Sequence, residues 1–171
     1  AFLADPSPRK AFVGGNQLGK TYCGAADALG RMRGDHPALG RWRPVPVHGW
    51  CVNSSWKQSL IIQRKLFEHL APGELAPGVR YTRKRGFTGS YVELRNGSTL
   101  TFVTAAQDTV DLASATLDFI WVDEPPPEHI WGELVARVRH KRGTIFLTLT
   151  PIGRPVDWLR LKCEGDAAEE I

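Results

Sequence analysis

Short apolar runs alternate along this chain with stretches in which apolar residues recur at helical spacing. Four apolar runs predict strands, at residues 10–13, 48–53, 117–122 and 144–150. The last two runs are almost continuously apolar, which is typical of strands buried on both faces of a sheet. Helical spacing predicts helices at residues 20–32, 55–70 and 129–139, with Ser54 or Ser55 as the N-cap of the second.

A hairpin is predicted between residues 91–94 and 99–103, because Asn96-Gly97 between them can adopt the positive φ angles of a tight turn. Glycines and prolines predict a loop over residues 34–47, and Pro125–Pro127 forbid continuation of the strand before them. Strands separated by helices favour an α/β fold, a three-layer sandwich with a mainly parallel sheet and the short antiparallel hairpin as an appendage. We expect one domain over residues 1–171.

The composition is that of a folded domain, with 42% hydrophobic and 23% charged residues among 171. The net charge of +4 permits contact with a polyanion without requiring it. Cys23, Cys51 and Cys163 form no CxxC pair, which favours reduced thiols over disulfides or a zinc site. Without a bilayer-spanning apolar run or a signal peptide, we expect a soluble intracellular protein with no membrane partner. The abrupt ends suggest a fragment of a longer polypeptide.

Residues 14–21, Gly-Gly-Asn-Gln-Leu-Gly-Lys-Thr, match the P-loop pattern G-x-x-x-x-G-K-[ST] between a predicted strand and a predicted helix. Glycines let the backbone amides point at one anionic centre, and the helix N-terminus adds its dipole. Lys20 would neutralise the β- and γ-phosphates, and the Thr21 hydroxyl would bind Mg²⁺. The alternative, a glycine-rich turn that contains lysine by chance, is disfavoured by the flanking elements. The predicted ATP-binding residues are Gly14, Gly15, Asn16, Gln17, Leu18, Gly19, Lys20 and Thr21.

Two adjacent acids, Asp123 and Glu124, end the predicted strand at 117–122. Parallel strands carry their ligand-binding residues at the carboxyl edge, where the first strand also delivers the P-loop. Asp123 can hold the magnesium ion and Glu124 can polarise the attacking water, which makes Lys20 and Glu124 the predicted catalytic residues. A solvated Asp-Glu turn is the alternative. Thr148 and Thr150 at the end of the next strand could sense the γ-phosphate or the water, or be ordinary β-favouring threonines.

Three segments together resemble the large terminase subunits of tailed bacteriophages. Residues 12–21 are similar to the family's Walker A loop, residues 119–127 to its Walker B region, and residues 143–151 to its coupling motif. The resemblance runs over nearly the whole chain. It implies a P-loop ATPase of the additional-strand type, which works as a homo-oligomeric ring and uses MgATP to drive double-stranded DNA into a viral procapsid.

The same resemblance implies partners and a location. The partners would be double-stranded DNA, the portal protein and the small terminase subunit, and the location would be the host cytoplasm and, transiently, the procapsid. The family's nuclease domain is not expected within these residues, because only 20 residues follow Pro151. Many relatives place an arginine in the P-loop or shortly before the acidic pair; these stretches here lack one, so Arg137 and Arg139 are the candidate arginine fingers.

Basic residues gather in two clusters, the first formed by Arg80, Arg83, Lys84 and Arg85 and the second by Arg137, Arg139, Lys141 and Arg142. Such charges could hold DNA phosphates without reading bases, remain solvated, or complete a neighbouring subunit's site. Five histidines are too dispersed for metal binding, and six tryptophans are assigned to core packing.

Two further functions remain open on sequence alone. A superfamily 2 helicase-like or repair translocase core shares both nucleotide motifs, but it needs a second RecA-like domain. A nucleotide-gated assembly module would bind ATP and barely hydrolyse it.

Overall fold

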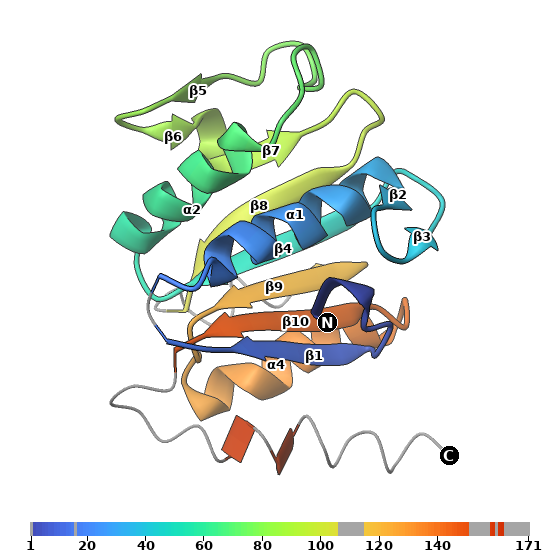
Figure 1. Ribbon diagram of the computed structural model, residues 1–171, viewed down its shortest axis with the longest axis vertical. Helices are drawn as coiled ribbons and strands as arrows, with labels where there is room; N and C mark the ends of the chain where they lie inside the picture. Colours follow the sequence, from blue (N-terminus) through green and yellow to red (C-terminus); the bar gives the residue numbers. More distant parts are fainter. Residues whose placement is uncertain (1, 16, 106–114, 151–157, 160, 163–171) are drawn as a thin grey trace.

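A computed structural model describes residues 2–15, 17–105, 115–150, 158–159 and 161–162. Six strands form one sheet in the order β1-β10-β9-β4-β8-β7 (Figure 1). Their bounds are β1 Arg9–Val13, β4 His48–Asn53, β7 Tyr91–Glu93, β8 Thr99–Thr104, β9 Phe119–Asp123 and β10 Thr144–Leu149. All neighbouring strands pair in parallel except β7, which runs antiparallel to β8. The predicted, mainly parallel sheet is confirmed.

One strand, β10, lies between β1, which leads into the P-loop, and β9, which ends at Asp123. This is the arrangement that an additional-strand ATPase requires. The predicted hairpin is present, with Tyr91 opposite Thr101, but it is not an appendage. Its second strand, β8, also pairs in parallel with β4 and buries Leu100 and Phe102 in the core. The antiparallel part is therefore the edge of the main sheet.

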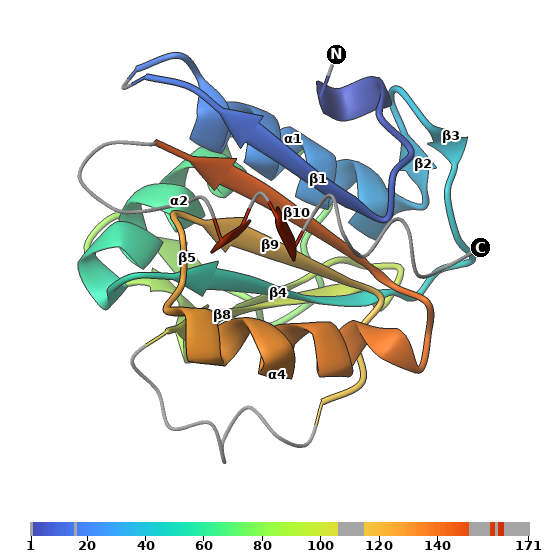
Figure 2. The same ribbon diagram turned by 90° about the horizontal axis from the view of Figure 1, so that it is seen from below.

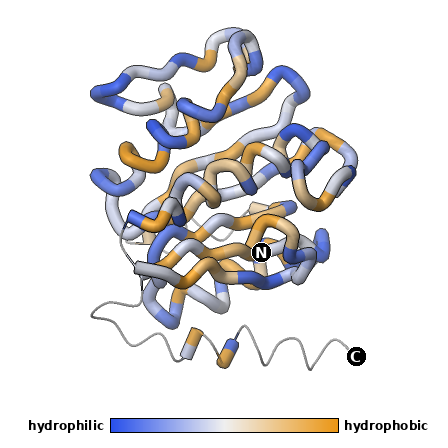
Figure 3. The backbone as a smooth tube through the Cα atoms, viewed as in Figure 1, coloured by the Kyte–Doolittle hydropathy of each residue, from blue (hydrophilic) through white to orange (hydrophobic). Residues whose placement is uncertain are grey.

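Helices cover both faces of the sheet (Figure 2). α1 (Lys20–Arg33) and α2 (Trp56–Glu68) lie on one face, and α4 (Glu128–Arg139) lies on the other. The first layer buries Leu29 and Ile62 against Trp121, and the second buries Trp131 against Leu147. Hydrophobic residues accordingly concentrate along the central strands (Figure 3). The three-layer sandwich is confirmed.

Several short elements were not predicted, because two or three residues show no periodicity. They are η1 (Phe2–Ala4), β2 (Asp35–His36), β3 (Gly40–Arg41), β5 (Tyr81–Thr82), β6 (Gly86–Phe87) and η2 (Thr88–Ser90). Strands β2 and β3 pair within the stretch predicted as a loop, and β5 pairs with β6 in a second small hairpin.

The cysteines and the helices agree with the expectations from composition. Cys23 and Cys51 are free thiols, and Cys163 lies outside the described residues. Burial raises the pKa of the Cys51 thiol well above its usual value, so this thiol is unreactive. Across the part of the chain that the structure describes, no helix has the length and apolar character needed to cross a membrane.

Two helical glycines offer a matched test of the packing between α1 and the sheet. A Cβ at Gly24 would lie 2.4 Å from the Trp121 indole, whereas a Cβ at Gly132 in α4 would meet nothing within 4 Å. We expect Gly24→Ala to destabilise the fold by about 1–3 kcal/mol through overpacking. Gly132→Ala should stabilise it by about 0.5–1 kcal/mol through helix propensity. Thermal unfolding of the two variants checks the opposite signs; a stabilised Gly24→Ala would contradict this packing.

Candidate active site

The loop between β1 and α1 curls back on itself. Gln17 and Gly19 adopt positive φ angles of 63° and 76°, and the Gly14 amide donates to the Leu149 carbonyl at 3.2 Å, which ties the loop to β10. Gly19 is the N-cap of α1 and provides no side-chain cap. The first-turn amides of α1 therefore offer donors at the positive end of the helix dipole. Asn16, one of the predicted binding residues, lies outside the described residues.

Lys20 lies inside this loop. Its side chain is buried, and its Nζ donates to the Gly15 carbonyl at 2.5 Å. Leu18, by contrast, is 62% exposed and lies on the outside of the loop. The lysine charge is thus held where the loop amides gather, which suits a bound polyphosphate.

The loop and the acidic strand end meet at one edge of the sheet. Thr21 Oγ1 lies 3.5 Å from Asp123 Oδ1, the outer limit for a hydrogen bond, although 102 positions separate the two residues in sequence. The meeting follows from the parallel sheet, since β1 and β9 both end at this edge on either side of β10. The structure therefore brings together the two groups on which the sequence prediction depends.

The Asp123 carboxylate is buried and held by several donors. Thr148 Oγ1 donates to Oδ1 at 2.7 Å, and Gln58 Nε2 donates to Oδ2 at 3.1 Å. Trp121 Nε1 in turn donates to Thr148 Oγ1 at 2.8 Å. Burial raises the pKa of Asp123, the charge of Glu124 adds to this rise, and the hydrogen bonds oppose it. The carboxylate is fixed in one orientation before any ligand arrives.

The neighbouring acid, Glu124, points elsewhere. Its φ of 70° is unusual for a residue with a side chain, and such strain is common at functional positions. Its amide donates to the Thr148 carbonyl at 3.0 Å. Its carboxylate accepts from both the amide and the hydroxyl of Thr150, at 3.3 and 3.1 Å. The two adjacent acids are thus oriented separately, each by one threonine of the β10 end.

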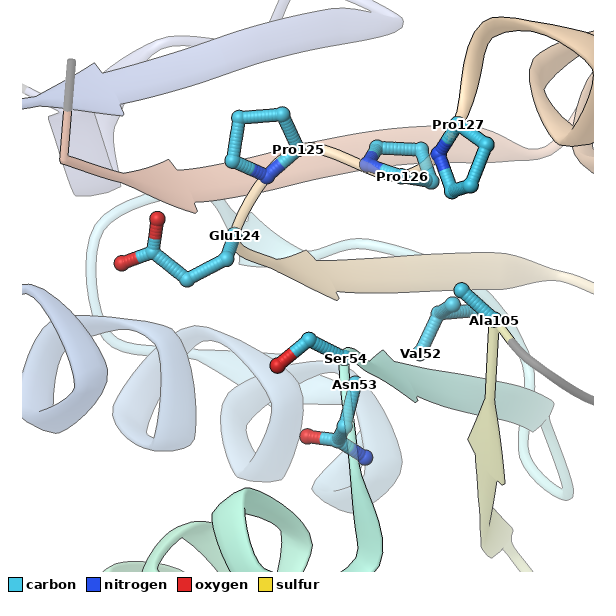
Figure 4. Close-up of a pocket in the computed structure, with 8 residues that line it drawn as sticks. All are labelled: Val52, Asn53, Ser54, Ala105, Glu124, Pro125, Pro126 and Pro127. Atoms are coloured by element: carbon cyan, nitrogen blue, oxygen red, sulfur yellow. The ribbon is translucent and has the colours of Figure 1, made fainter. Parts of the chain in front are cut away.

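A cavity of about 240 Å³ lies beside Glu124. Asn53 and Ser54 at the end of β4 and Pro125–Pro127 form much of its lining. Figure 4 shows the Glu124 carboxylate extending away from Pro126 and Pro127 and to the same side as the Ser54 hydroxyl. The space is large enough for water, and the carboxylate at its wall can accept a proton from one.

The oxygen atoms of Thr21 and Asp123 fit a magnesium ion, which binds hard oxygen donors and keeps several waters or phosphate oxygens as its other ligands. Among the described residues, no group of three or more His, Cys, Asp or Glu side chains is arranged as a metal site. Two protein oxygens without a full protein cage are what a magnesium ion that arrives with a nucleotide needs.

Three predicted site residues lie differently from the simplest expectation. The Thr148 hydroxyl is fully buried and bonded to Asp123, so it supports the carboxylate from below instead of facing the edge. Arg137 and Arg139 lie at the end of α4, and the Arg137 carbonyl accepts from Leu117, just before β9 begins. This is the edge of the sheet opposite Glu124. Within one subunit these arginines do not reach the site, and a role in a neighbour's site stays a prediction.

Sequence reasoning missed Gln58, which binds Asp123 from the first turn of α2. A signal was present, because the Ser55 hydroxyl caps this helix by accepting from the Gln58 amide. A capped helix that starts directly after β4 places its first-turn side chains at the carboxyl edge of the sheet. Arg31 also escaped notice, although it is fully buried.

Solved structures with the same fold come from bacteriophage large terminases. The ATPase domain of the Thermus phage P74-26 large terminase matches with a TM-score of 0.65 and 20% identity, over 88% of this chain and 62% of that one. A full large terminase from another thermophilic bacteriophage matches with a TM-score of 0.70 and 14% identity, over 98% and 39%. That second terminase in complex with ADP matches with a TM-score of 0.54 and 15% identity, over 82% and 33%.

The chain therefore spans less than two thirds of the length of each of these solved chains. A search of curated protein sequences finds no significant match. A sequence model of one family, described as terminase large subunit, T4likevirus-type, N-terminal, matches residues 11–155. Since this match covers most of the chain and includes the P-loop, Asp123 and Glu124, the chain belongs to the family of terminase large subunit N-terminal domains.

Proposed function

We propose that this chain hydrolyses MgATP as the motor domain of a terminase large subunit that moves double-stranded DNA into a procapsid. One observation carries the proposal. The P-loop threonine and the strand-end aspartate lie 3.5 Å apart at one edge of the sheet, beside a glutamate that borders a cavity. A loop that binds phosphates, a pair of oxygen ligands and a separate proton acceptor are the parts that ATP hydrolysis needs.

Nucleotide binding is assigned to residues 14–21. The loop amides and the N-terminus of α1 would hold the phosphate oxygens, and Lys20 would leave the Gly15 carbonyl to neutralise the β- and γ-phosphates. Thr21 and Asp123 would hold a magnesium ion, which supplies positive charge to the phosphates. The terminase structure solved in complex with ADP supports a nucleotide at the equivalent place in this fold.

Hydrolysis is assigned to Glu124. Its carboxylate would orient a water at the adjacent cavity and accept its proton, while Thr150 fixes the carboxylate through two hydrogen bonds. Thr148 and Thr150 would act as the coupling motif, because both lie on the strand end that contacts the two acids. A change at the phosphate can then be transmitted to β10.

The wider role follows from the family. We propose double-stranded DNA, the portal protein and the small terminase subunit as partners, a homo-oligomeric ring as the working form, and the host cytoplasm and procapsid as its location. The family match supports this role over a superfamily 2 helicase core. A neighbouring subunit would supply the activating arginine, because Arg137 and Arg139 lie at the opposite edge from Glu124 within one subunit.

Lys20→Ala tests nucleotide binding. Loss of charge-assisted hydrogen bonds worth about 1.5–3 kcal/mol should raise the Kd for MgATP by about 10- to 100-fold. Lys65→Ala is the matched control, since Lys65 lies on the surface of α2 and pairs only with Glu68 among the contacts that the structure describes. Titration of the full-length protein with a fluorescent ATP analogue measures both. An unchanged Kd for Lys20→Ala would exclude the P-loop assignment.

A further inference from the structure

A small hairpin carries three consecutive basic residues at its tip. β5 and β6 pair antiparallel, with Thr82 opposite Gly86, so that Arg83, Lys84 and Arg85 form the turn between them. All three residues of the turn are exposed. The hairpin lies beyond the β7 edge of the sheet, and its tip is hydrophilic (Figures 1 and 3). We call these three residues the hairpin tip.

The hairpin is fixed firmly to α2. The Tyr81 ring stacks on Phe67 of α2 at 4.2 Å and contacts the Phe87 ring at 5.1 Å. Gln63 of α2 accepts a hydrogen bond from the Phe87 amide at 2.8 Å. Gly86, at a φ of 73°, leaves room for this glutamine, because a Cβ there would lie 2.1 Å from Gln63 Oε1. The tip is therefore held by a rigid base despite its short strands.

The charge of the hairpin tip is not neutralised. None of Arg83, Lys84 and Arg85 forms an ion pair with any residue that the structure describes. The nearest acid on α2, Glu68, already pairs with Lys65 at 2.9 Å. The second basic cluster differs, because Lys141 pairs with Asp118 at 2.9 Å and Arg137 with Glu133 at 3.2 Å. Of the two basic clusters, the hairpin tip holds the more uncompensated charge.

We propose that the hairpin tip binds the phosphate backbone of duplex DNA. The proposal rests on the proposed function, in which the protein moves DNA, and it names the surface that does so. Three adjacent cations without an amide or aromatic neighbour in the turn suit contacts to phosphates, which carry no sequence information. Such contacts suit a motor that must hold every sequence alike.

The same helix connects this surface to the nucleotide site. α2 begins with Gln58, which donates to Asp123, and continues through Gln63 to the base of the hairpin. Because α2 is a single uninterrupted helix packed on the sheet, a shift of its first turn would move the hairpin as well. A DNA contact at the tip is thus placed where a change at the metal-binding carboxylate can reach it.

The test is the salt dependence of DNA binding by the full-length protein. A fluorescent duplex is titrated with wild type and with R83Q/K84Q/R85Q over a series of salt concentrations, without nucleotide. Each lost phosphate contact lowers the slope of log K against log salt by about 0.9, so the variant should lose about 2.7. The loss should be the same for duplexes of unrelated sequence. The control R139Q/K141Q/R142Q removes the same charge from the second basic cluster and should keep the wild-type slope.

Other outcomes overturn the proposal. An unchanged slope in the hairpin variant, an equal loss in the control, or a loss confined to one DNA sequence would each do so. A variant that keeps its DNA affinity but no longer associates with procapsids would show that the tip binds an acidic protein instead. MgATP binding by the hairpin variant separates the two proposals. If it is retained while the slope is unchanged, the surface assignment fails alone; if wild type binds neither MgATP nor DNA, the proposed function fails too.

Discussion

Replacing Glu124 by glutamine is expected to lower ATP turnover by about 10²- to 10⁴-fold, the usual contribution of a positioned general base. Glutamine has the same shape and keeps an oxygen that can accept from the Thr150 amide and hydroxyl, so the local structure should persist. It cannot take a proton from water. Phosphate release by the full-length protein measures the loss, and titration with an ATP analogue should give a Kd close to that of wild type.

Glu128→Gln is the control for this variant. Glu128 is an exposed acid in the first turn of α4, four residues beyond Glu124, and it lines no part of the cavity beside Glu124. Its turnover should match wild type. If Glu124→Gln hydrolyses ATP at the wild-type rate, the proton acceptor is another group and the assignment of Glu124 is wrong. If both variants lose activity equally, general loss of negative charge explains the result.

Much of the fold could be predicted because burial and spacing act locally. The strand predicted at residues 48–53 has these bounds in the structure, and α1 begins at Lys20, as the P-loop pattern requires. The pairing of β8 could not be predicted. Its alternation with β7 indicates a hairpin, but its parallel pairing with β4 depends on residues 51 positions away, as in His48 opposite Thr99.

The site shows the same division. Lys20, Thr21, Asp123 and Glu124 were found from a motif and a strand end, and the sheet brings them to one edge. What the sequence could not assign is which neighbour holds which oxygen. Gln58 lies 65 positions from Asp123 in the sequence, and the hydrogen bond between them depends on how α2 packs. Thr148 and Thr150 look equivalent in sequence, yet one supports each acid.

A buried ionic cluster on α1 also escaped the sequence, because its members lie on different elements. Asp27 pairs with Arg31 one turn later and with Lys10 of β1, whose Nζ lies 2.6 Å from Asp27 Oδ2. His36 Nε2 lies 3.6 Å from the same oxygen. All four side chains are buried. The cluster joins β1 to the helix that carries the P-loop, so it supports the site from beneath.

Asp27→Asn should destabilise the fold by about 3–5 kcal/mol, because it leaves Lys10 and Arg31 buried without their partner charge. For a domain of this size, the melting temperature should fall by about 6–20 °C. Thermal unfolding at neutral pH measures this. Glu68→Gln removes a carboxylate from a surface pair with Lys65 and should leave the melting temperature close to wild type.

The pH dependence gives the sign of the Asp27 contribution. Burial alone would raise the pKa of Asp27, but the hydrogen bond from His36 and the charges of Arg31 and Lys10 outweigh burial and lower it to about 2. A folded pKa below the unfolded value of 3.8 means that the stabilisation is fully present above that value and is lost as the pH falls through about 2. A shift of this size corresponds to about 2 kcal/mol. The stability difference between wild type and Asp27→Asn should therefore narrow between about pH 4 and pH 2, because only wild type can be protonated there. A difference that stays constant over this range would show that the Asp27 carboxylate is not charged in the folded protein.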